Sequence, residues 1–123
     1  MRKLVLALAG AVALVACDPT ETHEYSCTET FGSGDGAVTG CLQLEITEVE
    51  GNVAEGQCES RDGEWEYHAC ASANRVPGYC DVPGASDYTL SGKSARVYFY
   101  EPATAEAAQA ACESIDDATW VAP

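Results

Sequence analysis

The segment Cys58-Glu59-Ser60-Arg61-Asp62 returns later in the chain as Cys112-Glu113-Ser114-Ile115-Asp116. A tryptophan follows each copy, at Trp65 and at Trp120. Two earlier stretches match in the same order: Leu44-Glu45 with Tyr100-Glu101, and Tyr25-Ser26-Cys27 with Gly78-Tyr79-Cys80. From front to back the offsets are 53, 56, 54 and 55 residues. A nearly constant offset predicts two copies of one supersecondary unit, over residues 25–70 and 78–123.

Each copy has the same predicted order of elements, namely two strands, a helix and a strand. The first strands are expected near residues 24–29 and 78–82, and the second at 40–47 and 95–101. Leu42, Leu44 and Ile46 alternate with polar neighbours, as a half-buried strand requires. Each copy then ends in a strand through its tryptophan. The unit is ββαβ, which predicts an α+β domain with an antiparallel sheet and helices packed on it.

The two predicted helices differ in strength. In the second copy, apolar residues recur at helical spacing and Thr104 is a suitable N-cap. These residues are Ala105, Ala108, Cys112 and Ile115. The first helix is interrupted by Gly51 and Gly56, and Asn52 with Glu55 offers a capping-box-like start.

The N-terminus has the three parts of a secretory signal. Arg2 and Lys3 precede an apolar run from residue 4 to 15 that ends in small residues. Twelve residues span only about 18 Å as a helix, too short for a bilayer core of roughly 30 Å. An ordinary cleaved signal with a chance cysteine is the alternative to the interpretation that follows.

Leu14-Val15-Ala16-Cys17 resembles the lipobox of bacterial lipoproteins. The resemblance implies removal of residues 1–16, acylation of Cys17, and an acidic linker over residues 17–24. It therefore implies a palmitate-type anchor in a bacterial cell envelope, at the outer membrane or its periplasmic face. Asp18 resembles an inner-membrane retention signal, so the resemblance does not decide between the inner and the outer membrane. Several acyl chains give stable anchoring, whereas one chain binds only marginally.

With Cys17 assigned to lipid, six cysteines remain, which predicts three disulfides in an exported chain of this size. Cys27 and Cys58 occupy the same places in copy one as Cys80 and Cys112 in copy two. The duplication therefore predicts the bridges Cys27–Cys58 and Cys80–Cys112. Cys41 aligns with Val97, and the match of Cys70 falls beyond the C-terminus. Both partners of a third bridge are thus missing from copy two, which supports Cys41–Cys70.

Without residues 1–16 the chain has 107 residues, with 20 acidic residues against four basic ones and a net charge of −16. This length suits one domain with a modest core. The charge repels phosphate backbones and excludes a nucleic-acid partner. It repels anionic headgroups too, in keeping with a lipid tether to the membrane. Solubility is the simplest reason for the acidity.

A catalytic constellation is missing from the sequence, and no cofactor or metal is expected. His23 lies in the tether, and His68 lies beside Cys70 with no second base or ligand at a useful spacing. The glycine-rich residues 32–36 lack the basic residue of a phosphate loop and indicate a hairpin loop. The acidic run lacks EF-hand spacing and is expected to be a solvated face, although Ca²⁺ binding stays open. Its members are Glu45, Glu48, Glu50, Glu55, Glu59, Asp62, Glu64 and Glu66.

Aromatic residues gather around the predicted strand at Tyr98-Phe99-Tyr100. Together with Trp65 and Trp120 they form either a binding patch or, as we expect, a core face and a face that shields the helix. The whole pattern is similar to small, cysteine-rich lipoproteins of myxobacterial type, in which a helix with a cysteine leads into a Gly-x-Trp strand. Copy one has Asp62-Gly63-Glu64-Trp65, whereas copy two departs with Asp117-Ala118-Thr119-Trp120. That family implies location and fold, and no activity.

The sequence thus favours a lipid-anchored envelope lipoprotein that is a non-catalytic binding or structural module with an envelope protein as its partner. One alternative is a small disulfide-stapled inhibitor of an envelope or extracellular hydrolase, presenting the loop at 32–36 or at 83–87. A second alternative is a hydrolase, although the sequence contains no recognisable set of catalytic residues.

Overall fold

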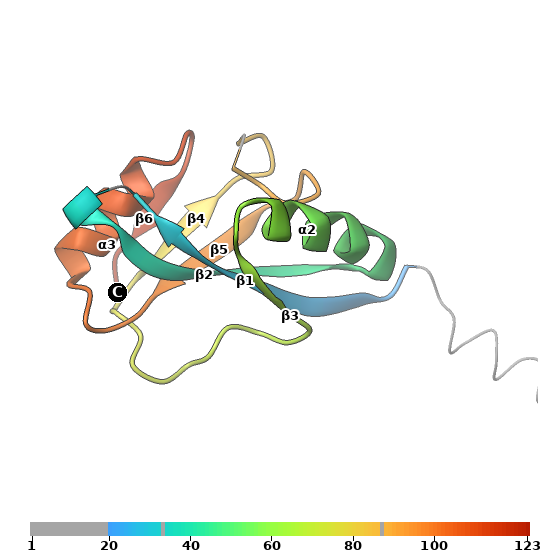
Figure 1. The fold of residues 1–123 in the computed structure, drawn as a ribbon, viewed down its shortest axis with the longest axis horizontal. Helices are drawn as coiled ribbons and strands as arrows, with labels where there is room; N and C mark the ends of the chain where they lie inside the picture. Colours follow the sequence, from blue (N-terminus) through green and yellow to red (C-terminus); the bar gives the residue numbers. More distant parts are fainter. Residues whose placement is uncertain (1–19, 33, 87) are drawn as a thin grey trace, which may run out of the picture.

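The computed structural model describes residues 20–32, 34–86 and 88–123 (Figure 1). The predicted leader and Cys17 lie outside the described residues, as do Ser33 and Asp87 in the two loops considered for an inhibitor. The elements follow in the order β1 (Thr22–Phe31), η1 (Gly34–Gly36), β2 (Val38–Thr47), α2 (Glu48–Ser60), β3 (Glu64–Glu66), β4 (Tyr79–Val82), β5 (Ala95–Phe99), α3 (Ala105–Glu113) and β6 (Thr119–Val121). Within these ranges, no helix is long and apolar enough to cross a membrane.

The strands form one antiparallel sheet in the order β3-β1-β2-β5-β4-β6. Cys27 in β1 lies opposite Leu42 and Trp65, and Cys80 in β4 lies opposite Val97 and Trp120. Leu42 and Val97 face each other across the central β2–β5 pair. The predicted α+β class with an antiparallel sheet is confirmed.

Both helices lie on the same face of the sheet. Directly opposed residues in a sheet point to the same side, so the side chains of Cys27, Leu42, Val97 and Cys80 share one face. Disulfides join Cys27 to Cys58 in α2 and Cys80 to Cys112 in α3. This side is called the helix face below. On the opposite side the described residues form no helix, and the segment between β3 and β4 runs along it (Figure 1).

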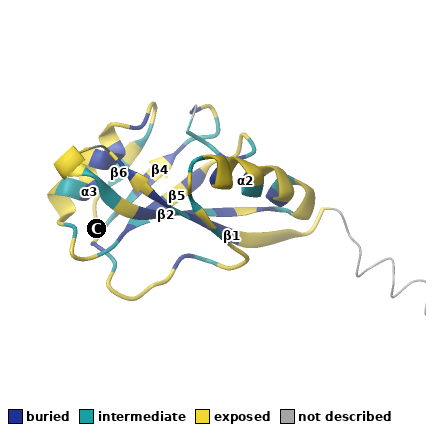
Figure 2. Cartoon of the chain, in the orientation of Figure 1, coloured by how far each residue is buried: buried dark blue, intermediate teal, exposed yellow. Residues whose placement is uncertain are grey.

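The core lies between the helices and the helix face of the sheet (Figure 2). Alternate residues of the strands supply it, among them Phe31, Leu42, Leu44, Val97 and Phe99, each at most 2 % exposed. Small residues let the helices approach closely, since Ala54 and Ala108 are fully buried. This alternation follows from the period of two in a strand whose other face lies outside the core.

All three predicted disulfides are present, as Cys27–Cys58, Cys41–Cys70 and Cys80–Cys112, with Cα–Cα distances of 6.0, 5.9 and 5.5 Å. The first and third cross from sheet to helix. The second lies on the other side of the sheet and attaches the segment between β3 and β4.

Several local predictions differ from the structure. The capping box of α2 is formed by Thr47 and Glu50, five residues earlier than expected, because Thr47 ends a strand and its hydroxyl oxygen accepts from the Glu50 N–H at 3.3 Å. In α3 the Thr104 cap is confirmed, but Ala105 is exposed and Ala111 takes a core position instead. Residues 22–24, expected in the linker, belong to β1.

The expected match of Cys41 with Val97 is displaced by one residue. Leu42 and Val97 occupy corresponding places, each opposite the buried cysteine of its hairpin. The two residues that lie opposite the buried cysteines are therefore 55 positions apart, whereas the expected match of the second strands has an offset of 56. Alternation decides the register, because a shift of one residue exchanges the two faces of a strand.

The structure explains why the Gly-x-Trp pattern has a glycine at position 63. A Cβ at this position would lie 2.6 Å from the Cys27 Sγ and 2.8 Å from the Cys58 Sγ. Only glycine fits so close to the disulfide. The preceding residue, Asp62, has a φ of 62°, and Asp117 has a φ of 64° before the second tryptophan strand. A left-handed residue therefore precedes the last strand in both places, directly after the C-cap of α2 and three residues after the C-cap of α3.

Candidate binding surface on the open face of the sheet

The face away from the helices, called the open face below, is the best candidate for a functional surface. Its side chains follow from the strand register and form two rows across the sheet. One row contains Glu66, Ser26, Gln43, Arg96, Asp81 and Thr119. The next contains Thr28, Cys41, Tyr98 and Tyr79. Charged, amide and phenol groups therefore dominate this face, in contrast to the apolar helix face.

Two arginine–tyrosine stacks lie side by side on the open face. The Arg75 guanidinium carbon is 3.7 Å from the Tyr98 ring centroid, and that of Arg96 is 4.5 Å from the Tyr79 ring centroid. The two tyrosine rings are themselves 6.0 Å apart. Stacking on an aromatic ring orients a guanidinium group and leaves its edge free to donate hydrogen bonds. Two of the four basic residues of the described chain thus gather on one side of an acidic protein.

The segment between β3 and β4 is fastened to this face. Besides the Cys41–Cys70 disulfide, the Cys70 N–H donates to the Gln43 Oε1 at 2.9 Å. The Arg75 Nε and Nη2 donate to the carbonyl oxygens of Ala71 and Cys70 at 2.7 and 2.9 Å. The Tyr100 hydroxyl also donates to the Ala71 carbonyl, at 2.7 Å. Arg75 therefore has a structural role, which leaves Arg96 as the less engaged arginine.

The other basic residues are paired with carboxylates. Arg61 lies 2.9 Å from Glu29, and Lys93 lies 2.9 Å from Glu50. In the part of the chain that the structure describes, Arg96 forms no ion pair. A cavity of about 490 Å³ lies beside it and is lined also by Glu24, Gln43, Glu45 and Asp81. The cavity thus combines one guanidinium with three carboxylates.

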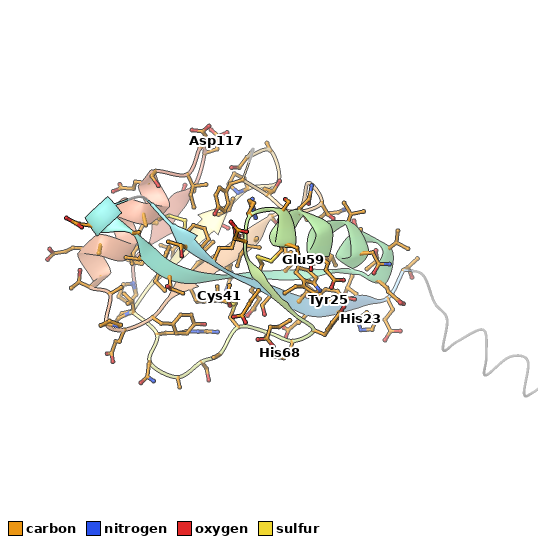
Figure 3. All side chains as sticks on the ribbon, viewed as in Figure 1. His23, Tyr25, Cys41, Glu59, His68 and Asp117 are labelled. Atoms are coloured by element: carbon orange, nitrogen blue, oxygen red, sulfur yellow. A yellow bond between two sulfur atoms is a disulfide. The ribbon has the colours of Figure 1, made fainter. Side chains whose placement is uncertain are left out.

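His68 gains the carboxylate neighbour that a catalytic base would need, but not the geometry. Its Nε2 lies 2.8 Å from the Glu66 carboxylate, and its Nδ1 lies 2.8 Å from the Ala69 carbonyl oxygen. These contacts raise its pKa, the Ala69 carbonyl contributing most and Glu66 next. Both ring nitrogens are occupied, so neither is directed at Ser26 or Thr28 in the adjoining 230 Å³ cavity. Figure 3 shows His68 on the segment that follows β3, well away from α2.

The acidic run does not converge on a metal site. Among the described residues, no group of three or more histidine, cysteine or carboxylate side chains is placed to hold a metal ion. Glu50 is engaged by Lys93 and by Thr47, whose hydrogen bonds lower its pKa to about 2. Glu55 accepts from the Tyr67 hydroxyl at 3.1 Å.

The aromatic residues divide between the two faces. Phe99 is fully buried on the helix face, as expected for a core residue. Trp65 stacks on Tyr25 at 5.3 Å, and Trp120 lies 6.3 Å from Phe99, so both tryptophans belong to the helix face as well. The expectation that the other side of this strand shields a helix was wrong, because Tyr98 lies on the open face. His23 is exposed and contacts the edge of the Tyr25 ring at 6.3 Å.

The structure contains a buried ion pair, between Glu29 and Arg61, that was not predicted from the sequence. Glu29 is 4 % exposed, although it lies on the helix face between Cys27 and Phe31. It accepts from the Arg61 Nη2 at 2.9 Å and from the Tyr88 hydroxyl at 3.3 Å, while Arg61 stacks on the Tyr88 ring at 4.3 Å. Burial is the largest influence on Glu29 and raises its pKa. The signal in the sequence was a carboxylate at a core position of an alternating strand.

Comparisons with known proteins add nothing to this geometry: no protein-family model, no curated protein and no solved structure matches the chain.

Proposed function

We propose that this protein is a lipid-anchored, non-catalytic binding module of a bacterial cell envelope, and that it binds its partner through the open face. The observation that carries the proposal is the asymmetry of the sheet. One face supports both α2 and α3 and the core, whereas the other presents stacked arginines and tyrosines that no helix of residues 20–123, as far as they are described, covers. Residues that only stabilise a fold do not need such an arrangement on a solvated face.

The proposed location rests on the leader and on the disulfides. The lipobox resemblance assigns Cys17 to a lipid, and three disulfides suit an oxidising compartment. Because β1 begins at Thr22, only residues 18–21 separate the proposed lipid from the sheet. Four residues reach at most about 14 Å, so the module would lie against the bilayer.

We also propose that the domain consists of two ββαβ copies. The strand order supports this, because β3-β1-β2 and β6-β4-β5 are the same arrangement in opposite directions. The disulfides Cys27–Cys58 and Cys80–Cys112 each join the first strand to the helix. Cys41–Cys70 has no counterpart in the second half, so the fastened segment on the open face is particular to the first half.

Growth with labelled palmitate tests the anchor. The wild-type chain should take up label and sediment with membranes, whereas Cys17→Ser should do neither. Uptake of label by both variants, or by neither, would refute the assignment of Cys17.

Tyrosine nitration tests the binding face. In envelope membranes, a bound partner should protect Tyr79 and Tyr98 relative to the purified protein. Tyr67 is an internal control, because it lies on the helix side, is 69 % exposed and contacts Glu55 of α2. Equal modification of Tyr79 and Tyr98 in both preparations would contradict a role for the open face.

A further inference from the structure

The sheet separates on the open face between its two central strands. The β2–β5 ladder runs from Gly40 opposite Phe99 to Gln43 opposite Arg96 and stops there. β2 nevertheless continues to Thr47. Alternate residues of a strand direct their peptide groups to alternate neighbours, so among the described residues the peptide groups of β2 that point toward β5 have no paired strand beyond Gln43. The 490 Å³ cavity opens at this place, lined on the two sides by Leu44 and Ala95.

Charges of both signs border this cleft. Arg96 lies at the end where the ladder stops, held over the Tyr79 ring at 4.5 Å. Glu24 and Glu45 are cross-strand neighbours on the β1–β2 side of the cleft. From strand spacing and rise, the Arg96 and Glu45 α-carbons are separated by about 8 Å. The guanidinium and the two carboxylates therefore border one cavity from different strands.

We infer that this cleft binds a short zwitterionic peptide, whose carboxylate contacts Arg96 and whose amino group contacts Glu24 and Glu45. The inference rests on the proposed function, since it names the ligand class of the open face. The unpaired edge of β2 supplies backbone hydrogen bonds to an extended chain, as in the addition of a strand to a sheet. A tripeptide spans roughly 10 Å when extended, which is close to the separation of about 8 Å between the Arg96 and Glu45 α-carbons.

Charge complementarity distinguishes this ligand from other occupants. A polyanion would approach a protein of net charge −14 against repulsion, and so would a second copy of the chain. An uncharged sugar would offer these groups only hydrogen bonds from neutral hydroxyls and no ion pair. A ligand with both charges can pair with Arg96 at one end and with Glu24 and Glu45 at the other, while Asp81 lies opposite Arg96 on the β4 side of the cleft.

Calorimetric titration of the full chain with trialanine tests the inference. Trialanine should bind saturably, and N-acetyl-trialanine and trialanine amide should each bind about tenfold more weakly, the factor for loss of one charge-assisted hydrogen bond. Arg96→Gln and Glu45→Gln should weaken trialanine binding by a similar factor, and Arg96→Lys by less, because lysine keeps the charge without the planar fork. Glu59→Gln removes an exposed charge from α2 and is the matched control, with unchanged affinity expected.

Equal affinity of the wild type and Arg96→Gln would overturn the inference, as would indifference to capping of either end of the peptide or the lack of saturable heat at millimolar trialanine. Circular dichroism of each variant shows that it is folded. The proposed function is tested separately, because protection of Tyr79 and Tyr98 in membranes can persist when trialanine fails to bind. Failure of the peptide with protected tyrosines would then indicate a different ligand on the same face.

Discussion

The side chains of β5 alternate between two very different surroundings. Val97 and Phe99 are fully buried against the helices, whereas Arg96 and Tyr98 lie on the open face and stack with other polar groups. One strand thus serves two purposes, because its period of two separates residues that stabilise the domain from residues available to a ligand. Substitutions on the helix face should therefore change the free energy of unfolding, and those on the open face should change binding.

The disulfides give the largest test of this contrast. Sequence separations of 31, 29 and 32 residues predict nearly the same chain-entropy contribution for each bridge, about 3.6 kcal/mol. Removing Cys80–Cys112 by double substitution to alanine should cost more than that, roughly 5 kcal/mol, because it also leaves space between α3 and the sheet. Guanidinium unfolding without reductant measures both this variant and its open-face counterpart.

The counterpart, Cys41→Ala with Cys70→Ala, should lose about 3 kcal/mol and release the segment between β3 and β4. Hydrogen exchange should therefore rise in residues 67–76 while the helices stay protected. If this variant were the less stable of the two, the assignment of stability to the helix face would be wrong.

Adjacent residues of β5 give the second test. Phe99→Ala removes a fully buried ring that contacts Phe31 edge-to-face at 5.6 Å, and should cost about 4 kcal/mol. Tyr98→Ala loses the stacking of Arg75 and should cost roughly 1 kcal/mol. Both values come from denaturant midpoints at constant slope. Similar losses at the two positions would show that the open face contributes to the core.

A third test compares two carboxylates of opposite faces. Glu29→Ala leaves Arg61 without its carboxylate in a largely buried site and should cost about 3 kcal/mol. Glu66→Ala breaks an exposed pair with His68 and should change stability by less than about 0.5 kcal/mol. Thermal unfolding at neutral pH distinguishes the two, and a near-neutral Glu29→Ala would mean that water replaces the lost contact.

The pH dependence of Glu29 follows from the same burial. Its folded pKa lies above the unfolded one, so its contribution is fully present below the unfolded value near 4.5 and is lost as pH rises through the folded value. Relative to Glu29→Gln, the wild type should therefore gain stability as the pH is lowered from neutrality toward 4.5. A constant difference between the two proteins would contradict the raised pKa.

Much of the fold could be predicted from the sequence because the similarity between residues 25–70 and 78–123 relates residues that are far apart in the chain. Matching Cys27-Cys58 with Cys80-Cys112 related long-range pairs that periodicity alone does not connect. The local start of α2 could not be read in the same way. Asn52 with Glu55 and Thr47 with Glu50 both satisfy a capping pattern, and only the end of β2 at Thr47 selects between them.

The arrangement of side chains on the open face could not be predicted from the sequence, for a different reason. Arg75 and Tyr98 are 23 positions apart, and their stacking depends on the course of the segment fastened by Cys70. Nothing in the sequence distinguishes Arg96 from the other three basic residues. Only the strand register shows that it lies beside Tyr79 and the cleft. Alternation alone would assign a side to these residues, but not the neighbours that orient them.

The smallest expected effect compares the two helices that cover the same face. Thr47→Ala and Thr104→Ala each remove an N-cap acceptor, and each should cost about 1 kcal/mol. Only the first cap includes a carboxylate, because Glu50 accepts from the Thr47 N–H and hydroxyl, both at 3.0 Å, whereas Ala107 occupies the same position of α3. Lys93 contributes most to the low pKa of Glu50, about 2, and Thr47 adds to it.

A depressed folded pKa gives stability that is present above the unfolded value, near 4.5, and lost as pH falls through about 2. The difference between the wild type and Thr47→Ala should therefore shrink between pH 4.5 and 2, while the difference for Thr104→Ala stays constant. Urea unfolding at both ends of this range measures the two differences. Parallel behaviour of the two variants would mean that the Thr47 hydroxyl adds nothing to the low pKa, which Lys93 and the N–H of residue 47 would then maintain, and that the caps of α2 and α3 are equivalent despite their different sequences.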